Sequence, residues 1–155
     1  MAAGEPGVEV PFDLKERAMD EAPVGITISD PDRPDNPLIY VNRAFERVTG
    51  YPRSEVLGNN CRMLQGPESD PETVARMREA IDAEEPVQVE ILNYRKDGTE
   101  FWNEVTIAPL TNHAGEVTNF VGFQADVTAR KEAELALERE RANLAHLVER
   151  INGLL

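Results

Sequence analysis

Thiol and imidazole side chains are scarce in this 155-residue sequence, which has one cysteine, Cys61, and two histidines, His113 and His146. A single cysteine excludes a disulfide within the chain, and so few sulfur and nitrogen ligands exclude a zinc site. The histidines are expected in a turn and in a polar helix, where neither suits a partner for a cysteine nucleophile or an axial haem ligand. The sequence therefore disfavours a cysteine protease and a haem sensor.

Positive charge is also limited, because 16 basic residues stand against 29 acidic ones and give a net charge of -13. Phosphate groups would be repelled, so we expect no direct contact with nucleic acid or with an anionic membrane. No signal peptide and no long hydrophobic run is recognisable, which predicts a cytoplasmic protein. Hydrophobic residues make up 41% of the chain, enough for one core, so one domain with an extension is expected.

Prolines, glycines and hydrophobic periodicity divide the sequence into four segments. Residues 1–10 are rich in Gly, Pro and Glu and are predicted to be disordered. Residues 11–22 are predicted to form a short N-terminal cap helix. Residues 23–128 are expected to form one α+β domain, and residues 129–155 one long helix.

The α+β fold class is predicted from an order of two strands, several short helices and three further strands. Lys96-Asp97-Gly98 is a strong hairpin signal between the third and fourth strands. We therefore expect a five-stranded antiparallel sheet with the short helices on one face. The expected strands cover residues 24–29, 38–41, 87–95, 99–110 and 117–127, and the expected helices of the domain cover residues 42–48, 51–57 and 70–84.

Cys61 lies in a short polar segment with Asn60, Arg62 and Gln65. On its own, a lone cysteine is most often a small buried hydrophobe, and an arginine such as Arg78 is most often a solvated surface residue. Arg62 and Arg78 together could clamp a phosphate in the forked geometry that guanidinium groups favour. The segment suits a site in which a thiol faces a bound ring system and arginines hold the anionic tail of the ligand.

Three carboxamides, those of Asn93, Asn103 and Gln124, are expected on strand faces that are otherwise apolar, since side chains alternate along a strand. An unpaired buried amide costs on the order of 1–3 kcal/mol. The three amides could satisfy one another or loop backbone, or they could bind a buried polar ligand. A heterocycle edge with alternating donors and acceptors, such as the pyrimidine side of a flavin, would fit the second alternative.

The segment Asn60-Cys61-Arg62-Met63-Leu64-Gln65-Gly66 resembles the Asn-Cys-Arg-Phe-Leu-Gln signature of the LOV (light-oxygen-voltage) domains, the flavin-binding blue-light sensors of the PAS superfamily. The resemblance runs from about Val24 to Thr128. A generic PAS domain would share the fold but not the cysteine motif together with both asparagines and the late glutamine. Further matching segments are Asp35-Asn36-Pro37, Gly66-Pro67-Glu68, Asn93-Tyr94, Lys96-Asp97-Gly98, Phe101-Trp102-Asn103, Gly122-Phe123-Gln124 and Asp126-Val127-Thr128.

The resemblance implies a PAS/LOV fold and a role for each matching side chain. Cys61 would be the photoreactive thiol that forms a reversible covalent adduct with the flavin C4a carbon. Gln124 would face the flavin N5/O4 edge and, by rotating its amide, read the gain of a proton at N5. The implied cofactor is FMN, with FAD as a possible extension. The other implied cofactor-binding residues are Thr27, Leu38, Leu64, Ile107 and Phe120 along the ring, Asn60 and Gln65 on the ribityl chain, Arg62 and Arg78 on the phosphate, and Asn93 and Asn103 on the pyrimidine.

The sequence departs from the LOV pattern at Met63, where phenylalanine is usual, at Asn59, where arginine is frequent, and at Val105, where many plant members have an aromatic residue. None of these changes removes a required atom, and Met63 is expected to affect the lifetime of the adduct. Two alternatives remain open, a flavin redox sensor that would not need Cys61 and a PAS dimerisation module that binds another ligand or none. No kinase, cyclase or DNA-binding motif is present, so a photosensory domain rather than an enzyme is expected.

The helix expected over residues 129–155 carries Leu137, Leu144 and Ile151 at intervals of seven, which is a short coiled-coil pattern. This apolar side could fold back on the sheet or pair with a second subunit. We favour a homodimer through the N- and C-terminal helices, with a downstream effector domain in a longer chain. The ending, residues 149–155, resembles the linker of bacterio-opsin-activator-like regulators.

Overall fold

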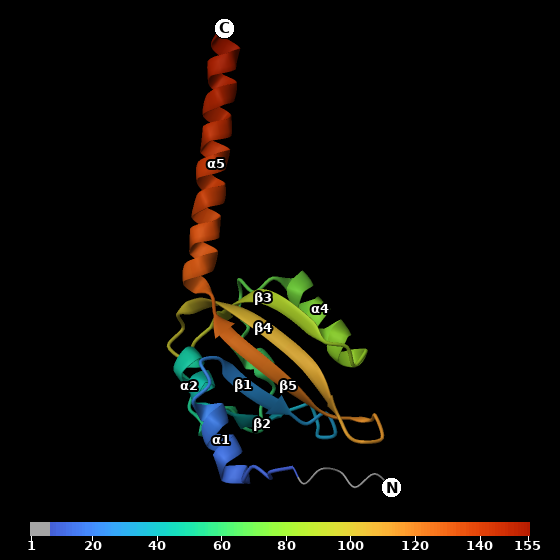
Figure 1. Ribbon diagram of the computed structural model, residues 1–155. Coiled ribbons are helices and arrows are strands. Elements are labelled where there is room, and N and C mark those ends of the chain that lie inside the picture. The colour runs from blue at the N-terminus through green and yellow to red at the C-terminus, as the bar shows by residue number, and fades with distance from the viewer. Residues whose placement is uncertain (1–6) are drawn as a thin grey trace.

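One antiparallel sheet of five strands forms the centre of the structure, a computed structural model that describes residues 7–155 (Figure 1). The strand order across the sheet is β2-β1-β5-β4-β3, so the last strand of the chain lies in the middle. This arrangement confirms the predicted α+β, PAS/LOV fold. The strands are β1 (Gly25–Ser29), β2 (Leu38–Val41), β3 (Val87–Tyr94), β4 (Glu100–Thr111) and β5 (Val117–Asp126).

Two of the helices begin at a polar side chain that the sequence offers as a cap. Asn42 precedes α2 and accepts a hydrogen bond from the backbone N–H of Phe45, and Asp70 accepts one from Glu72 at the start of α4. The predicted disorder of residues 1–10 falls mostly outside the described residues, and residues 7–11 have no helix or strand. The helices are α1 (Phe12–Asp20), α2 (Arg43–Thr49), α3 (Arg53–Val56), the 3-10 helix η1 (Cys61–Leu64), α4 (Pro71–Asp82) and α5 (Thr128–Leu154).

The core consists of two separate apolar clusters, and members of both line one cavity. The first cluster joins β2 to α2, α3 and η1 through Leu38, Val41, Phe45, Val56 and Leu64. The second joins α4 to β3 and β4 through Met77, Val89, Ile91 and Val105. The sheet and the short helices therefore enclose space for a ligand rather than a continuous core.

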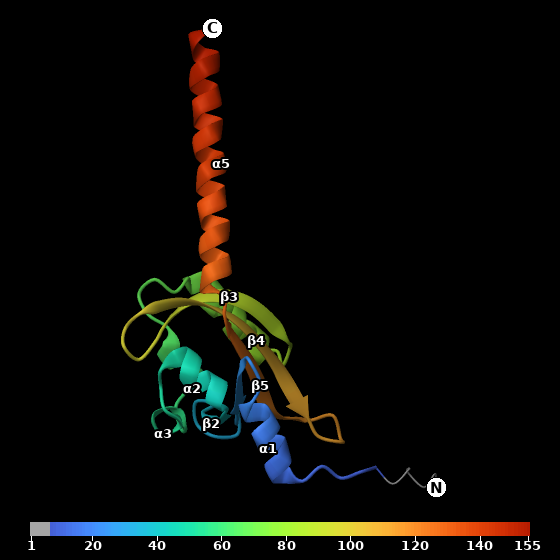
Figure 2. The same ribbon diagram turned by 60° about the vertical axis from the view of Figure 1, so that its left-hand side comes forward.

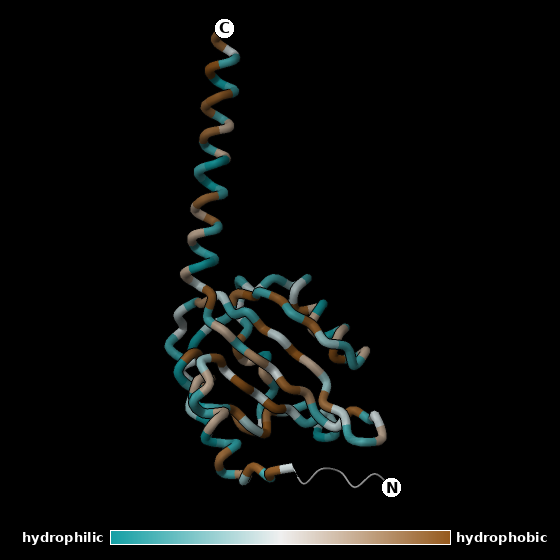
Figure 3. Tube along the Cα trace, in the orientation of Figure 1, coloured by the Kyte–Doolittle hydropathy of each residue, from teal (hydrophilic) through white to brown (hydrophobic). Residues whose placement is uncertain are grey.

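The long helix α5 leaves the domain as a single rod, while α1 lies at the opposite end (Figures 1 and 2). Apolar and polar residues alternate along the length of α5 (Figure 3). Leu137, Leu144 and Ile151 are 49%, 62% and 51% exposed, so the expected heptad row has no partner among residues 7–155. The helix therefore does not fold back on its own sheet, and its pairing with a second subunit stays a prediction. No helix within the described part of the chain combines the length and apolar character needed to span a bilayer.

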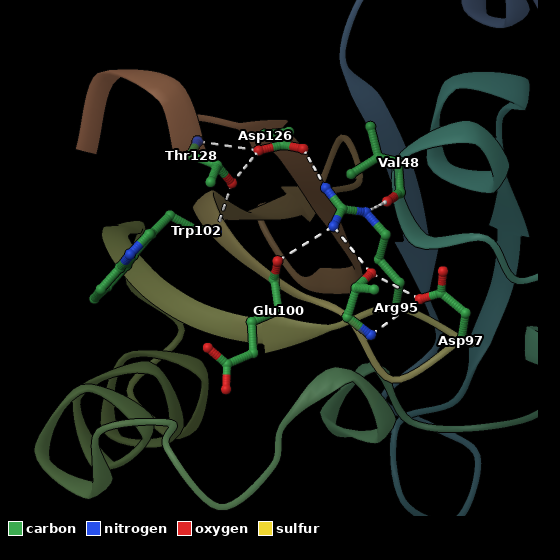
Figure 4. Close-up of polar contacts among 8 residues, drawn as sticks. Val48, Arg95, Asp97, Glu100, Trp102, Asp126 and Thr128 are labelled. Carbon is green, nitrogen blue, oxygen red and sulfur yellow. Dashed lines mark hydrogen bonds and ion pairs between the residues drawn. The ribbon is translucent and has the colours of Figure 1, made fainter. Parts of the chain in front are cut away.

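A hydrogen-bond network joins the start of α5 to β4, β5, α2 and the turn after β3 (Figure 4). Asp126, the last residue of β5, accepts the backbone N–H of Thr128 at 3.0 Å and pairs with Arg95 at 2.6 Å. Arg95 also donates to the carbonyl oxygen of Val48 at 3.1 Å. The hydroxyl oxygen of Thr128 accepts the backbone N–H of Trp102 on β4 at 3.0 Å. The sequence predicts Thr128 or Asp126 as the cap of this helix, but the residue at the cap position is Val127, and Asp126 instead accepts the N–H of the first helical residue.

An ion-pair cluster fixes the next residues of α5 to the outer face of the sheet. Arg130 lies 3.1 Å from Glu90 on β3, 3.3 Å from Glu104 on β4 and 2.8 Å from Glu134 in its own helix. Lys131 lies 3.3 Å from Glu90. The first turns of α5 are thus anchored, and the rest of the helix is exposed. A movement of β5, or of the sheet face that carries Glu90 and Glu104, would therefore change the direction of α5.

Asp126→Asn is expected to lower the free energy of unfolding by about 0.2–1 kcal/mol, because it removes the charge that pairs with Arg95, while asparagine can still accept the N–H of Thr128. Burial alone would raise the pKa of Asp126, but hydrogen bonds from Thr128 and the charge of Arg95 outweigh burial and lower it. A lowered folded-state pKa gives stability that is present above the unfolded value of 3.8 and is lost as the pH falls through the folded value.

Denaturant unfolding at pH 7 and at pH 3 measures this contribution. The gap in stability between the wild-type chain and Asp126→Asn should be widest at pH 7 and smaller at pH 3. Asp32→Asn, which removes an exposed carboxylate from a loop, is the matched control and should leave stability unchanged. An equal gap at both pH values would show that the carboxylate charge of Asp126 does not stabilise the start of α5.

Candidate functional site

A cavity of about 500 Å³ lies between the sheet and the helices η1 and α4. This volume is within the range of small-molecule and cofactor sites. Leu64, expected along a ring system, is buried in the first core cluster with Leu38 and Phe45 and is not among the residues that line the cavity, so its place along a ring stays a prediction. The cavity brings together all other side chains that the sequence singled out, namely Thr27, Leu38, Asn60, Cys61, Arg62, Gln65, Arg78, Asn93, Asn103, Ile107, Phe120 and Gln124.

The three carboxamides are buried in this cavity, with exposed fractions of 3% for Asn93, 0% for Asn103 and 2% for Gln124. Asn103 donates its Nδ2–H to Oδ1 of Asn93 at 3.0 Å, so two of the amides partly satisfy each other. The oxygens Oδ1 of Asn103 and Oε1 of Gln124 have no hydrogen-bond partner among the described residues. Since a buried unpaired acceptor costs about 1–3 kcal/mol, both oxygens favour a polar ligand, and Oδ1 of Asn103 favours one that offers an N–H donor.

Cys61 and Gln124 are in direct contact across the cavity. Gln124 on β5 donates its Nε2–H to Sγ of Cys61 at 3.2 Å. Burial raises the pKa of the Cys61 thiol, and the hydrogen bond from Gln124 lowers it only in part. The thiol is therefore neutral at pH 7, so it is not an activated thiolate nucleophile of the hydrolase kind. Any reaction at Sγ has to be started by the ligand rather than by a neighbouring base.

The local fold positions the thiol through Asn60, which precedes η1. The side-chain oxygen of Asn60 accepts the backbone N–H of Arg62 at 2.9 Å, and its Nδ2 donates to the carbonyl oxygen of Asp35 at 2.8 Å. Both polar ends of this amide are thus used within the protein, although Asn60 also lines the cavity. The segment that carries Cys61 is consequently tied to the loop before β2.

Gly122 keeps one wall of the cavity flat. A Cβ atom at this position would lie 2.4 Å from Oγ1 of Thr27 on the neighbouring strand, which no real Cβ tolerates. Gly122 shares a face of β5 with Phe120 and Gln124, and all three line the cavity. The missing side chain leaves room for a planar group against the sheet.

Several lining residues were not among those predicted. The strand members on the same faces, such as Ile91 beside Asn93, could have been found by extending the alternation along each strand. Asn36 has a buried side-chain oxygen without a partner among the described residues, and only its place in the Asp-Asn-Pro motif drew attention to it. The additional lining residues are Ser29, Asp35, Asn36, Val74, Met77, Ile81, Asp82, Ile91, Val105, Val121 and Gly122.

Comparison with known proteins places this site in a sensor family. The PAS domain family matches residues 23–129. The chain is 49% identical over 142 residues to the bacterioopsin transcriptional activator of Halobacterium salinarum, covering 92% of this chain and 21% of that protein. It is 44% identical over 136 residues to a blue-light photoreceptor of Listeria monocytogenes, covering 88% of this chain and 53% of that protein.

A solved LOV domain from a blue-light activated histidine kinase of Erythrobacter litoralis superimposes with a TM-score of 0.67 at 48% sequence identity. The match covers 70% of this chain and 99% of that one. By contrast, the chain spans only about a fifth to a half of the two curated relatives described above. The shared fold, the family match and the identity over nearly the whole of a solved LOV domain together show that this chain belongs to the PAS domain family and, within it, to the LOV domains.

Proposed function

We propose that this chain is the photosensory domain of a blue-light receptor, which binds FMN in the cavity and signals through a reversible bond between Cys61 and the flavin. The observation that carries the proposal is the contact of Gln124 with Sγ of Cys61, beside two buried amide oxygens that have no partner within residues 7–155. The blue-light relatives agree with it. A lone buried cysteine would not need such surroundings.

The lining residues fit a flavin. Asn93 and Asn103 would hold the pyrimidine edge, where Oδ1 of Asn103 lacks a donor. The apolar wall near Phe120 and Ile107 would pack against the ring, and Gln65 would meet the ribityl chain. Arg62 and Arg78 supply positive charge for one phosphate, which favours FMN, and FAD could extend outward from the same position.

When bound, the flavin would absorb blue light and accept the thiol at its C4a carbon. Cys61 would supply the sulfur of the new bond, and its thiol proton would pass to the flavin N5. Gln124 would then face a donor where it had faced an acceptor, and rotation of its amide would satisfy the new pairing. Spontaneous reversal in the dark would restore the starting state, so this domain would switch without turning over a substrate.

The helix α5 would transmit the light signal from the domain to the rest of a longer chain. Gln124 is two residues before Asp126, which accepts a hydrogen bond from the backbone N–H of Thr128, so a change of the amide can reach the start of α5 along β5. The exposed heptad row of α5 suits a parallel homodimer, and α1, at the other end of the domain, would form a separate contact. In a longer chain this helix would lead to an effector domain, as the length of the curated relatives suggests.

The test is an absorption spectrum of the purified chain in darkness and after blue light. A structured flavin band that bleaches and recovers in the dark is the expected result. A flavin band that never bleaches would favour the redox-sensing alternative, in which Cys61 has no chemical role. Absence of flavin, even after FMN is added, would leave a PAS module for another ligand or for dimerisation.

Asn103→Leu is expected to weaken flavin binding by about 1–3 kcal/mol, roughly a five- to 150-fold rise in Kd. The substitution keeps a similar volume but removes the amide that would pair with the pyrimidine, and it also leaves Oδ1 of Asn93 without its donor. Fluorescence titration with FMN measures the change. The matched control is Gln88→Leu, an exposed amide on the opposite face of β3, which should bind as the wild-type chain does. Unchanged affinity in Asn103→Leu would contradict the proposed ring placement.

A further inference from the structure

The two arginines of the cavity differ in their surroundings. Arg62 forms an ion pair and hydrogen bond with Oδ1 of Asp35, a residue that also lines the cavity. Arg78 makes no ion pair with any residue in the described part of the chain. The side chains of Arg62 and Asp35 are 51% and 60% exposed, so their contact lies at the opening of the cavity. One of the two cations therefore already has an anionic partner.

The backbone conformation of the loop and its hydrogen bonds fix the position of Asp35. Asp35 and Asn36 have φ angles of 69° and 46°, in the left-handed region that Asp and Asn tolerate better than most residues. The carbonyl oxygen of Asp35 accepts Nδ2 of Asn60, and the same amide caps the 3-10 helix that carries Arg62. Leu38 donates its backbone N–H to the carbonyl oxygen of Asn59 at 2.8 Å, which closes the link between the two segments. The loop thus holds a carboxylate against Arg62 in a defined place.

We propose that Asp35 is a specificity-determining residue, because it competes with the anionic tail of the bound ligand for Arg62. This competition limits how strongly the site prefers a phosphate-bearing ligand over an uncharged one. This inference rests on the proposed binding of a flavin. FMN and riboflavin are suitable probes because they differ by one phosphate group. A phosphate that binds Arg62 has to displace Asp35 or share the guanidinium with it, whereas riboflavin makes no such demand.

The exposure of the Arg62–Asp35 ion pair sets the size of the expected change in ligand preference. A half-exposed ion pair is screened by solvent and is weaker than a buried one. We therefore expect a rise of about 1.5- to fivefold in the ratio of the Kd for riboflavin to the Kd for FMN when the carboxylate of Asp35 is removed. The Kd for riboflavin itself should change less than twofold, and this internal reference shows that the cavity is intact.

The experiment titrates the full 155-residue chain, freed of bound flavin, with FMN and with riboflavin. Asp35→Asn removes the charge and tolerates the positive φ, and Asp35→Gly removes the side chain at the same φ without strain. Asp32→Asn, an equal charge change in the same loop at an exposed residue, is the control and should leave the ratio unchanged. Arg62→Gln, alone and combined with Asp35→Asn, completes a double-mutant cycle.

The preference for FMN should rise in both Asp35 variants, and most of this rise should vanish in the Arg62→Gln background. A rise that persists in full without Arg62 would overturn the proposal, because Asp35 would then act by direct repulsion. An unchanged ratio, or one that Asp32→Asn reproduces, would also overturn it while leaving flavin binding in place. Failure of both flavins to bind the wild-type chain would instead remove the proposed function, and this inference with it.

Discussion

Cys61→Ala is expected to bind flavin as the wild-type chain does and to lose reversible blue-light bleaching completely. The side chain is the only thiol in the sequence, and it lines the cavity in contact with Gln124. In the proposed mechanism the buried, neutral thiol does not react until light excites the flavin, and alanine offers no atom that could bond to the flavin. Absorption spectra recorded before illumination, after it and during dark recovery measure the loss.

Met63→Leu is the matched control for this prediction. Met63 is the other sulfur-bearing residue of η1 and packs against the first core cluster. Its replacement keeps the thiol and should leave bleaching intact, with a change only in the rate of dark recovery. Cys61→Ser, which keeps the size of the side chain, should behave like the alanine variant. Bleaching and recovery in Cys61→Ala would show that the photochemistry does not involve this residue.

The strands and their inward faces were predictable because alternation along a strand is a local property of the sequence. Asn93, Asn103 and Gln124 stood out as polar residues on apolar faces, and the structure brings them to one cavity. The caps of α2 and α4 were equally local, since Asn42 and Asp70 each bond to a backbone N–H within the next three residues. Sequence patterns succeed where the deciding contact lies within a few residues.

Other features depend on contacts between distant segments. The burial of Leu64 in one cluster with Leu38 and Phe45 depends on contacts of η1 with β2 and α2. The three prolines in residues 31–37 predict a loop, but the left-handed backbone of Asp35 and Asn36 depends on Asn60, 25 residues away from Asp35. The direction of α5 likewise depends on ion pairs with β3 and β4 that helical periodicity cannot reveal.

Gln124→Leu is expected to separate the light reaction from its output. Leucine fills a similar volume but can neither donate to Sγ of Cys61 nor exchange donor for acceptor, so bleaching should persist while the response of α5 is lost. Hydrogen exchange over residues 128–140, in darkness and under blue light, measures that response. A light-induced loosening of the anchored turn by 1–2 kcal/mol in the wild-type chain would speed exchange about five- to thirtyfold.

The physical reason for this expectation is the route along β5. Gln124 is buried against β4 opposite Val105, and two residues later Asp126 binds both Arg95 and the first turn of α5. Gln65→Leu is the matched control, because it removes a cavity amide that is not on β5 and should keep the light-dependent exchange. If Gln124→Leu retained the full exchange response, the signal would have to travel through another element, and the ion pairs of Arg130 with the outer face of β3 and β4 would be the next contacts to break.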